Sequence, residues 1–188
     1  MMSWDSTHED CQLWTGFKAN DRGAFAELYR RYVRVLYNYG AKFTKDSDLL
    51  EDAIQDLFTD LWRLRHNLAD TTSVKFYLFG ALRRRLHKRI SADSIYVERN
   101  LIENLDSIFG TEPSHEQVQI GRETQELLKQ NLQRALAGLP KRQYEALNLK
   151  FYENFPYPQI AEIMGVNEQS VRNFIQKAIQ TLREAMLT

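Results

Sequence analysis

Apolar side chains recur at intervals of three and four residues along most of this 188-residue chain, the period of α-helices that bury one face. In residues 24–43 this stripe comprises Phe25, Leu28, Tyr29, Tyr32, Leu36, Tyr39 and Phe43. In residues 47–65 it comprises Leu50, Ile54, Leu57, Leu61 and Leu64. No stretch alternates convincingly with the two-residue period of a strand, so the sequence predicts an all-α fold.

The remaining pattern predicts two domains. A third helix is expected over 73–90, and from 91 to 114 the period fails while Gly110 and Pro113 interrupt a polar stretch. Helical spacing resumes over 115–136, after which Gly138 marks a helix end and Pro140 the first position of the next helix. We therefore predict two small helical domains, 1–92 and 115–188, joined by a flexible linker over 93–114.

The composition and the N-terminal sequence indicate in which cellular compartment the protein is expected. A hydrophobic content of 43% predicts a folded chain, and the single cysteine, Cys11, excludes an intramolecular disulfide. The acidic start lacks the basic and apolar segments of a signal peptide, and the longest apolar run, 76–82, is too short to cross a bilayer. We expect a soluble, cytoplasmic protein.

The stretch "QIAEIMGVNEQSVRNFIQKAI", residues 159–179, predicts a helix-turn-helix. Ala161 is small enough for a second helix to approach the first. Gly165 can adopt the left-handed conformation that ends a helix, and Asn167 is a suitable N-cap for the next one.

One face of that second helix is rich in amide and guanidinium groups, which match the edges of adenine and guanine in the major groove. On a helical wheel this face holds Gln169, Arg172, Asn173, Gln176, Gln180 and Arg183, with Ser170 and Lys177 placed to contact phosphates. The alternative is an ordinary solvated face. Because residues 141–188 carry 6 basic and 5 acidic residues, we expect weak DNA binding by this domain alone.

Basic residues concentrate in 63–90, which holds 8 of them and 1 acidic residue. The cluster Lys75, Arg83, Arg84, Arg85, Lys88 and Arg89 surrounds the aromatic residues Phe76, Tyr77 and Phe79. Cations can follow a phosphate backbone and rings can stack on unpaired bases, so this segment predicts contact with an opened DNA strand. The alternative is core aromatics followed by cations that compensate the helix dipole.

The helix over 47–65 carries an acidic stripe at every fourth residue, formed by Asp48, Asp52, Asp56 and Asp60. A solvated surface is expected, because no histidine joins the stripe to complete a metal site. Phe58 and Trp62 lie at the edge of the leucine face beside Gln55. They form either a protein-binding surface or part of the core, and periodicity leaves both interpretations open.

In this order the segments resemble the extracytoplasmic-function (ECF) sigma factors, small two-domain bacterial initiation factors that direct RNA polymerase to promoters. "AFAELYRRYVRVLYNYG" resembles the first conserved helix of that family, and "DLLEDAIQDLFTDLW" resembles the segment that grips the β′ clamp helices of the polymerase. The resemblance implies that core polymerase is contacted by Gln55, Asp56, Phe58 and Trp62.

The resemblance also implies promoter contacts in both domains. A base-capturing loop at 67–74 and the residues Lys75, Tyr77, Arg83, Arg84, Lys88 and Arg89 would melt and read the −10 element. The −35 element would be read through Ser170, Arg172, Asn173, Gln176 and Lys177. The β flap of the polymerase is a further implied partner, and so is an anti-sigma factor, although no residue of the chain points to one.

Two other functions compete with this hypothesis. A helix-turn-helix regulator would bind duplex operator DNA as a dimer, without docking on polymerase. An enzyme would need a catalytic group, but the four histidines are scattered and Cys11 has no evident base. No glycine-rich phosphate loop or metal-ligand spacing is evident either. We therefore expect no catalytic residue, metal or cofactor.

Overall fold

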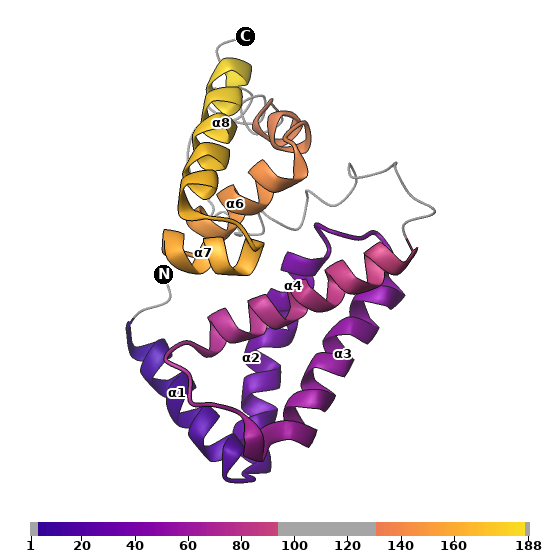
Figure 1. Cartoon of the computed structure of the whole chain (residues 1–188), viewed down its shortest axis with the longest axis vertical. Helices are drawn as coiled ribbons and strands as arrows, with labels where there is room; N and C mark the ends of the chain where they lie inside the picture. Colours follow the sequence, from indigo (N-terminus) through magenta and orange to yellow (C-terminus); the bar gives the residue numbers. More distant parts are fainter. Residues whose placement is uncertain (1–3, 94–130, 187–188) are drawn as a thin grey trace, which may run out of the picture. The chain divides into compact units, whose positions relative to one another are not determined.

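The computed structural model describes residues 4–93 and 131–186, which belong to two compact units (Figure 1). The first unit contains α1 (Trp4–Lys18), α2 (Arg22–Gly40), α3 (Ser47–Leu64), the 3-10 helix η1 (Arg65–Asn67) and α4 (Val74–Asp93). The second contains a helical segment over 131–137, then α6 (Lys141–Phe151), α7 (Tyr157–Met164) and α8 (Glu168–Met186). Every described element is helical, so the all-α class is confirmed.

The predicted linker over 93–114 lies outside the described residues except for Asp93, which ends α4. The predicted helix over 115–136 is described only from residue 131, and it continues to residue 137. In the described ranges, no helix is long and apolar enough to cross a membrane.

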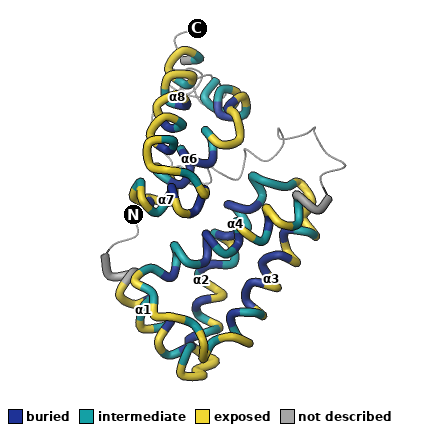
Figure 2. Tube along the Cα trace, in the orientation of Figure 1, coloured by how far each residue is buried: buried dark blue, intermediate teal, exposed yellow. Residues whose placement is uncertain are grey.

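The predicted apolar stripes form the core of the first unit, where α4 lies across α2 and α3 (Figure 1). Buried residues recur along each of these helices, as Figure 2 shows. Leu36, Leu57 and Leu82 are each 2% exposed or less, and fully burying a leucine contributes roughly 1.5–3 kcal/mol. Tyr29 and Leu64 depart from the prediction, because both are 44% exposed.

The helix α1 was not predicted. Its few apolar residues form no continuous stripe, yet it packs against α2 and α4 through two aromatic side chains. Trp14 and Phe17 are 2% and 0% exposed. The Trp14 Nε1–H also donates a hydrogen bond to the carbonyl of Ala69 at 3.2 Å, which ties α1 to the segment between η1 and α4.

Side-chain caps define where two helices begin. The Asp21 carboxylate accepts hydrogen bonds from the N–H groups of Gly23 and Ala24, at 2.7 and 3.2 Å, so the predicted cap of α2 is confirmed. In the second unit, Pro140 is at the N-cap of α6 rather than at its first helical position. That prediction was wrong by one residue, because Pro140 is extended, at φ −55° and ψ 139°.

The helix-turn-helix prediction is confirmed in the second unit. Gly165 ends α7 in the left-handed conformation, at φ 64° and ψ 41°, and the Val166 N–H reaches back to the Ala161 carbonyl at 3.0 Å. The Asn167 side chain then accepts a hydrogen bond from the Ser170 N–H at 2.8 Å. Between the two helices and α6 lies a core that includes Ala146, Leu149, Ile160, Val171, Ile175 and Ala178.

Candidate nucleic-acid interface

A cavity of about 270 Å³ opens between α3 and α4. Its apolar surface comes from Leu57, Leu61, Leu64, Leu68 and Ala81. Its polar lining comes from Asp60, Tyr77, Arg84, Arg85 and Lys88. Three of the predicted −10 residues, Tyr77, Arg84 and Lys88, therefore meet at one place. An apolar floor beside a ring and several cations suits a planar base that carries a phosphate.

The arginines of α4 differ in what they contact. Arg85 forms an ion pair with Asp60 of α3 at 2.7 Å, and this hydrogen bond lowers the pKa of Asp60 below its ordinary value. Arg89 pairs in the same way with Asp56. In the described part of the chain, Arg84 and Lys88 are exposed and form no ion pair. They are the cations of this helix best placed to meet an added phosphate.

These pairs correct the expectation of a fully solvated acidic stripe. Asp48 and Asp52 are exposed, but Asp56 and Asp60 bind the basic helix. Asp56 pairs with Arg89, and Asp60, four residues later on α3, pairs with Arg85, four residues earlier on α4. The two helices are therefore antiparallel where they form these ion pairs. Among the residues that the structure describes, no cluster of acidic, histidine or cysteine side chains could hold a metal ion.

The other predicted −10 residues lie outside the wall of the cavity. Lys75, Arg83 and Arg89 are half-buried and do not line it. Lys75 places its Nζ 5.6 Å from the centroid of the Phe79 ring. Tyr77, which does line the cavity, packs its ring 5.1 Å from that of Trp14, so α1 supports this ring from behind.

The predicted polymerase-contact residues of α3 differ in their exposure to solvent. Gln55 and Asp56 are exposed, and Trp62 is half-buried. Phe58 is only 3% exposed, and its ring packs against Tyr29 at a centroid distance of 4.9 Å. Phe58 therefore belongs to the core of the first unit, and its predicted contact with polymerase stays a prediction.

Trp62 is partly accessible to solvent at the edge of the aromatic cluster formed by Phe25, Tyr29 and Phe58. Its ring lies 5.0 Å from that of Phe25, and the Arg65 guanidinium lies 4.4 Å from its centroid. Of the four predicted contact residues, Gln55, Asp56 and Trp62 are thus the ones that solvent reaches.

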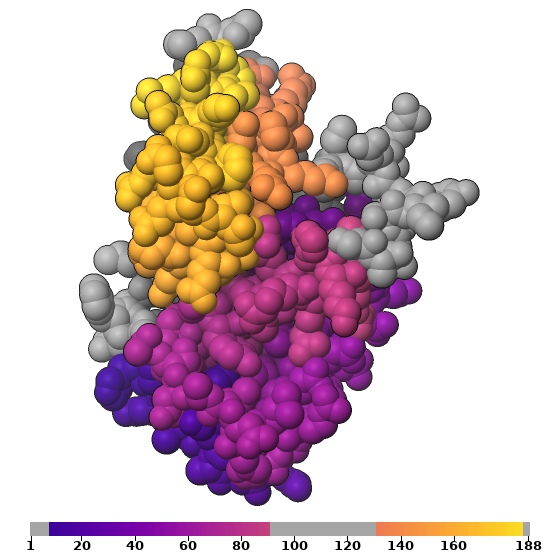
Figure 3. Space-filling view, in the orientation of Figure 1, coloured from indigo at the N-terminus to yellow at the C-terminus, as the bar shows by residue number. Residues whose placement is uncertain are grey.

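In the second unit, α8 runs along the surface of its domain (Figure 3). Arg172, Asn173, Gln176 and Lys177 are exposed as the wheel predicts, and Ser170 is half-buried. Short-range contacts order the exposed face. The Gln169 amide donates to Asn173 Oδ1 at 3.1 Å, and Arg172 pairs with Glu168 at 3.4 Å.

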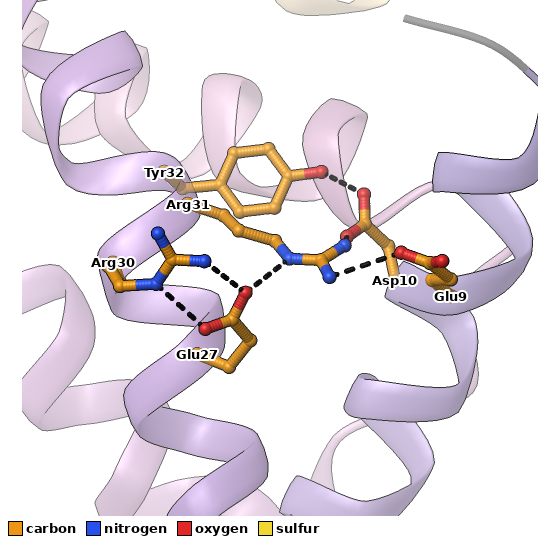
Figure 4. Close-up of polar contacts among 6 residues, drawn as sticks. All are labelled: Glu9, Asp10, Glu27, Arg30, Arg31 and Tyr32. Atoms are coloured by element: carbon orange, nitrogen blue, oxygen red, sulfur yellow. Dashed lines mark hydrogen bonds and ion pairs between the residues drawn. The ribbon is translucent and has the colours of Figure 1, made fainter.

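A polar network that the sequence analysis missed joins α1 to α2 (Figure 4). Arg31 at its centre pairs with Glu27 at 2.8 Å, Asp10 at 3.0 Å and Glu9 at 3.1 Å. Hydrogen bonds from Arg30 and Arg31 lower the pKa of Glu27 to about 2. No local pattern links residues 9 and 31, so the network becomes predictable only when α1 is placed beside α2.

The buried phenol of Tyr32 completes the network by donating a hydrogen bond to Asp10, a residue that is 9% exposed. Burial, and then this hydrogen bond, raise the pKa of Tyr32 above its ordinary value. The network holds α1 in place behind Tyr77 and so supports the cavity indirectly.

Two sequence families match the chain. Residues 28–94, from within α2 to just past α4, match "Sigma-70 region 2". Residues 129–182, which include the helix-turn-helix, match "Sigma-70, region 4". The first match covers the cavity and its cations, and the second covers the exposed face of α8.

Curated relatives match both units together. The chain is 28% identical over 163 residues to "ECF RNA polymerase sigma factor SigM" of Bacillus subtilis, covering 84% of this chain and 91% of the relative. It is 26% identical over 168 residues to "ECF RNA polymerase sigma factor RpoE" of Cereibacter sphaeroides, covering 88% of each.

Two solved structures share the fold. One is the sigma factor RpoE in complex with the anti-sigma factor NepR from Bartonella quintana, with a TM-score of 0.59 and 21% identity over 87% of this chain and 97% of that one. The other is CnrH in complex with the cytosolic domain of CnrY, with a TM-score of 0.60 and 18% identity over 93% of this chain and 95% of that one.

Proposed function

The chain belongs to the ECF RNA polymerase sigma factor family, and from this premise we propose that it binds core RNA polymerase and directs the enzyme to promoters, where it assists DNA melting. It acts in the cytoplasm as a specificity subunit and carries no catalytic step of its own. The chemistry of RNA synthesis belongs to the polymerase.

The observation that carries this proposal is the cavity between α3 and α4. An unpaired −10 base would enter it, with its face against Tyr77 and the apolar floor, while Arg84 and Lys88 neutralise the flanking phosphates. Lys75, Arg83 and Arg89 are the other proposed −10 contacts, although Arg89 is also paired with Asp56. A duplex reader has no use for such a site, because the bases of a duplex stay stacked.

The second unit would read the −35 element from the major groove. Its exposed Arg172, Asn173 and Gln176 have the hydrogen-bonding groups that match purine edges, while Ser170 and Lys177 would contact phosphates. Since the chain has 25 basic and 25 acidic residues, its DNA affinity would come mainly from its place in the holoenzyme.

On α3, the exposed residues Gln55 and Asp56 and the half-buried Trp62 would contact the β′ clamp helices. The second unit would contact the β flap. An anti-sigma factor is a third proposed partner, supported by the anti-sigma complex in which the sigma factor RpoE of similar fold was solved.

Reconstitution tests the proposal. The full-length protein is mixed with core polymerase, and run-off transcription is measured on a pool of genomic fragments against core enzyme alone. We expect a one-to-one complex and transcripts that start at defined sites. A chain that fails to bind core polymerase, yet forms a dimer on a palindromic duplex, would contradict this function and favour the operator-binding regulator.

A further inference from the structure

Two cations and one aromatic ring from three different helices meet in the second unit. Lys150 near the end of α6 places its Nζ 4.7 Å from the centroid of the Tyr157 ring. Arg172 of α8 places its guanidinium carbon 4.5 Å from the same centroid. Tyr157 is the first residue of α7 and is half-buried. Neither Lys150 nor Tyr157 has a role in the proposed promoter contacts.

The Tyr157 ring attracts both cations. Like charges repel, but the negative face of an aromatic ring attracts a cation within about 6 Å of its centroid. Arg172 is held a second time by Glu168, at 3.4 Å, one helical turn earlier on α8. The side chain of Arg172 nevertheless stays 51% exposed, so its guanidinium is both oriented and accessible.

We propose that Tyr157 is a positioning residue for the −35 contact made by Arg172. A free arginine loses the entropy of several rotatable bonds when it binds, whereas one already held by a ring and a carboxylate loses less. The stack would keep Arg172 aligned for bidentate bonding to a guanine edge. Lys150, held on the same ring, adds a second positive charge for a neighbouring phosphate. This inference rests on the proposed function.

The experiment compares Tyr157→Leu, which removes the ring, with Tyr157→Phe, which keeps it. Duplexes are first selected from a random pool by wild-type holoenzyme, and the affinity of each variant holoenzyme for them is then measured. Tyr157→Leu is expected to weaken binding by about twofold to fivefold and to relax the preference at one base position. Tyr157→Phe is expected to bind as the wild type does. An equal loss in both variants would assign the effect to the hydroxyl and overturn the proposal.

A double-mutant cycle separates positioning from a structural role. In an Arg172→Ala background, Tyr157→Leu is expected to cause no further loss of affinity, because the residue acts through the missing guanidinium. The same loss in both backgrounds would overturn the proposal, since Tyr157 would then act on the fold or on DNA directly.

An NMR measurement tests the stack without DNA. The Arg172 Hε resonance in the full-length protein should carry a ring-current shift that Tyr157→Phe keeps and Tyr157→Leu abolishes. A shift absent from the wild type would overturn the stack itself. Wild-type holoenzyme that selects no duplex, in spite of a normal shift, would overturn the proposed function and this role together.

Discussion

Arg85 of α4 donates a hydrogen bond to Asp60 of α3 at 2.7 Å, so its charge is neutralised inside the fold. Arg89 does the same with Asp56. The basic segment over 63–90 therefore offers less positive charge to DNA than its sequence indicates. Neighbouring arginines on one helix thus acquire different functions, because only some of them face the acidic helix.

Arg84→Ala should impair promoter binding, whereas Arg85→Ala should mainly affect the fold. Arg84 lines the cavity without an ion pair in the described residues, so its loss should remove one of the proposed phosphate contacts. We expect the slope of log affinity against log salt concentration, for holoenzyme on a promoter fragment, to fall by about one released ion. The yield of run-off transcripts should fall as well.

Arg85→Ala is the matched control. Asp60 keeps its second partner, Arg63, at 2.6 Å, and a partly exposed pair contributes only about 0–1 kcal/mol. We expect a slightly lower melting temperature and an unchanged salt dependence. Equal losses of salt dependence in the two variants would show that Arg85 leaves Asp60 to meet DNA.

Gln55→Ala should weaken the complex with core polymerase without changing stability. The side chain is exposed on the proposed contact surface of α3, so its truncation leaves the core intact. Gln12→Ala on α1, also an exposed glutamine, is the control and should bind normally. Affinity is measured by titrating labelled protein with core enzyme, and indistinguishable affinities for the two variants would remove Gln55 from the interface.

Phe58→Ala should behave as a core substitution. The ring is 3% exposed and packs against Phe25 and Tyr29, so its loss should destabilise the first unit by about 3–5 kcal/mol. Urea denaturation followed by circular dichroism measures this loss. A variant that keeps wild-type stability and yet fails to bind polymerase would return Phe58 to the contact surface.

The first unit should lose stability in acid through Glu27. The folded state lowers the pKa of this carboxyl from 4.5 to about 2, so its contribution is present above the unfolded value and is lost as the pH falls toward 2. Glu27→Gln should lower the melting temperature near neutral pH and make it less dependent on pH in this window. Asp52→Asn, at an exposed carboxylate of the same unit, is the control. If the melting temperatures of wild type and Glu27→Gln fell with pH by the same amount, the prediction would be contradicted.

Gly165→Ala should destabilise the helix-turn-helix for a conformational rather than a steric reason. A Cβ atom at this position would meet nothing within 4 Å, but the left-handed φ of 64° costs a non-glycine residue roughly 1–2 kcal/mol. Gly138→Ala, at a glycine of the same unit without a positive φ, should cost less. The melting temperatures of the two variants are compared by thermal unfolding. An equal decrease in both would mean that the left-handed conformation of Gly165 is not the cause of the destabilisation.

The amino-acid sequence alone determined the features that depend on neighbours along the chain. The spacing of apolar residues predicted α2 and α3, and the succession of Ala161, Gly165 and Asn167 predicted the helix-turn-helix. The order of the segments predicted the family. These properties are local, because 3.6 residues per turn and a left-handed glycine need no distant partner.

The element that each helix face meets depends on the packing of the whole unit. A helical wheel gives the direction of Phe58 or Arg85 but not the identity of the element packed against it, so the core position of one and the ion pair of the other could not be predicted. The same holds for α1, whose place depends on Trp14 and on contacts to Arg31 rather than on a periodic stripe. Packing brings together residues that are distant in the chain, and that proximity distinguishes the cations paired within the fold from those exposed to solvent.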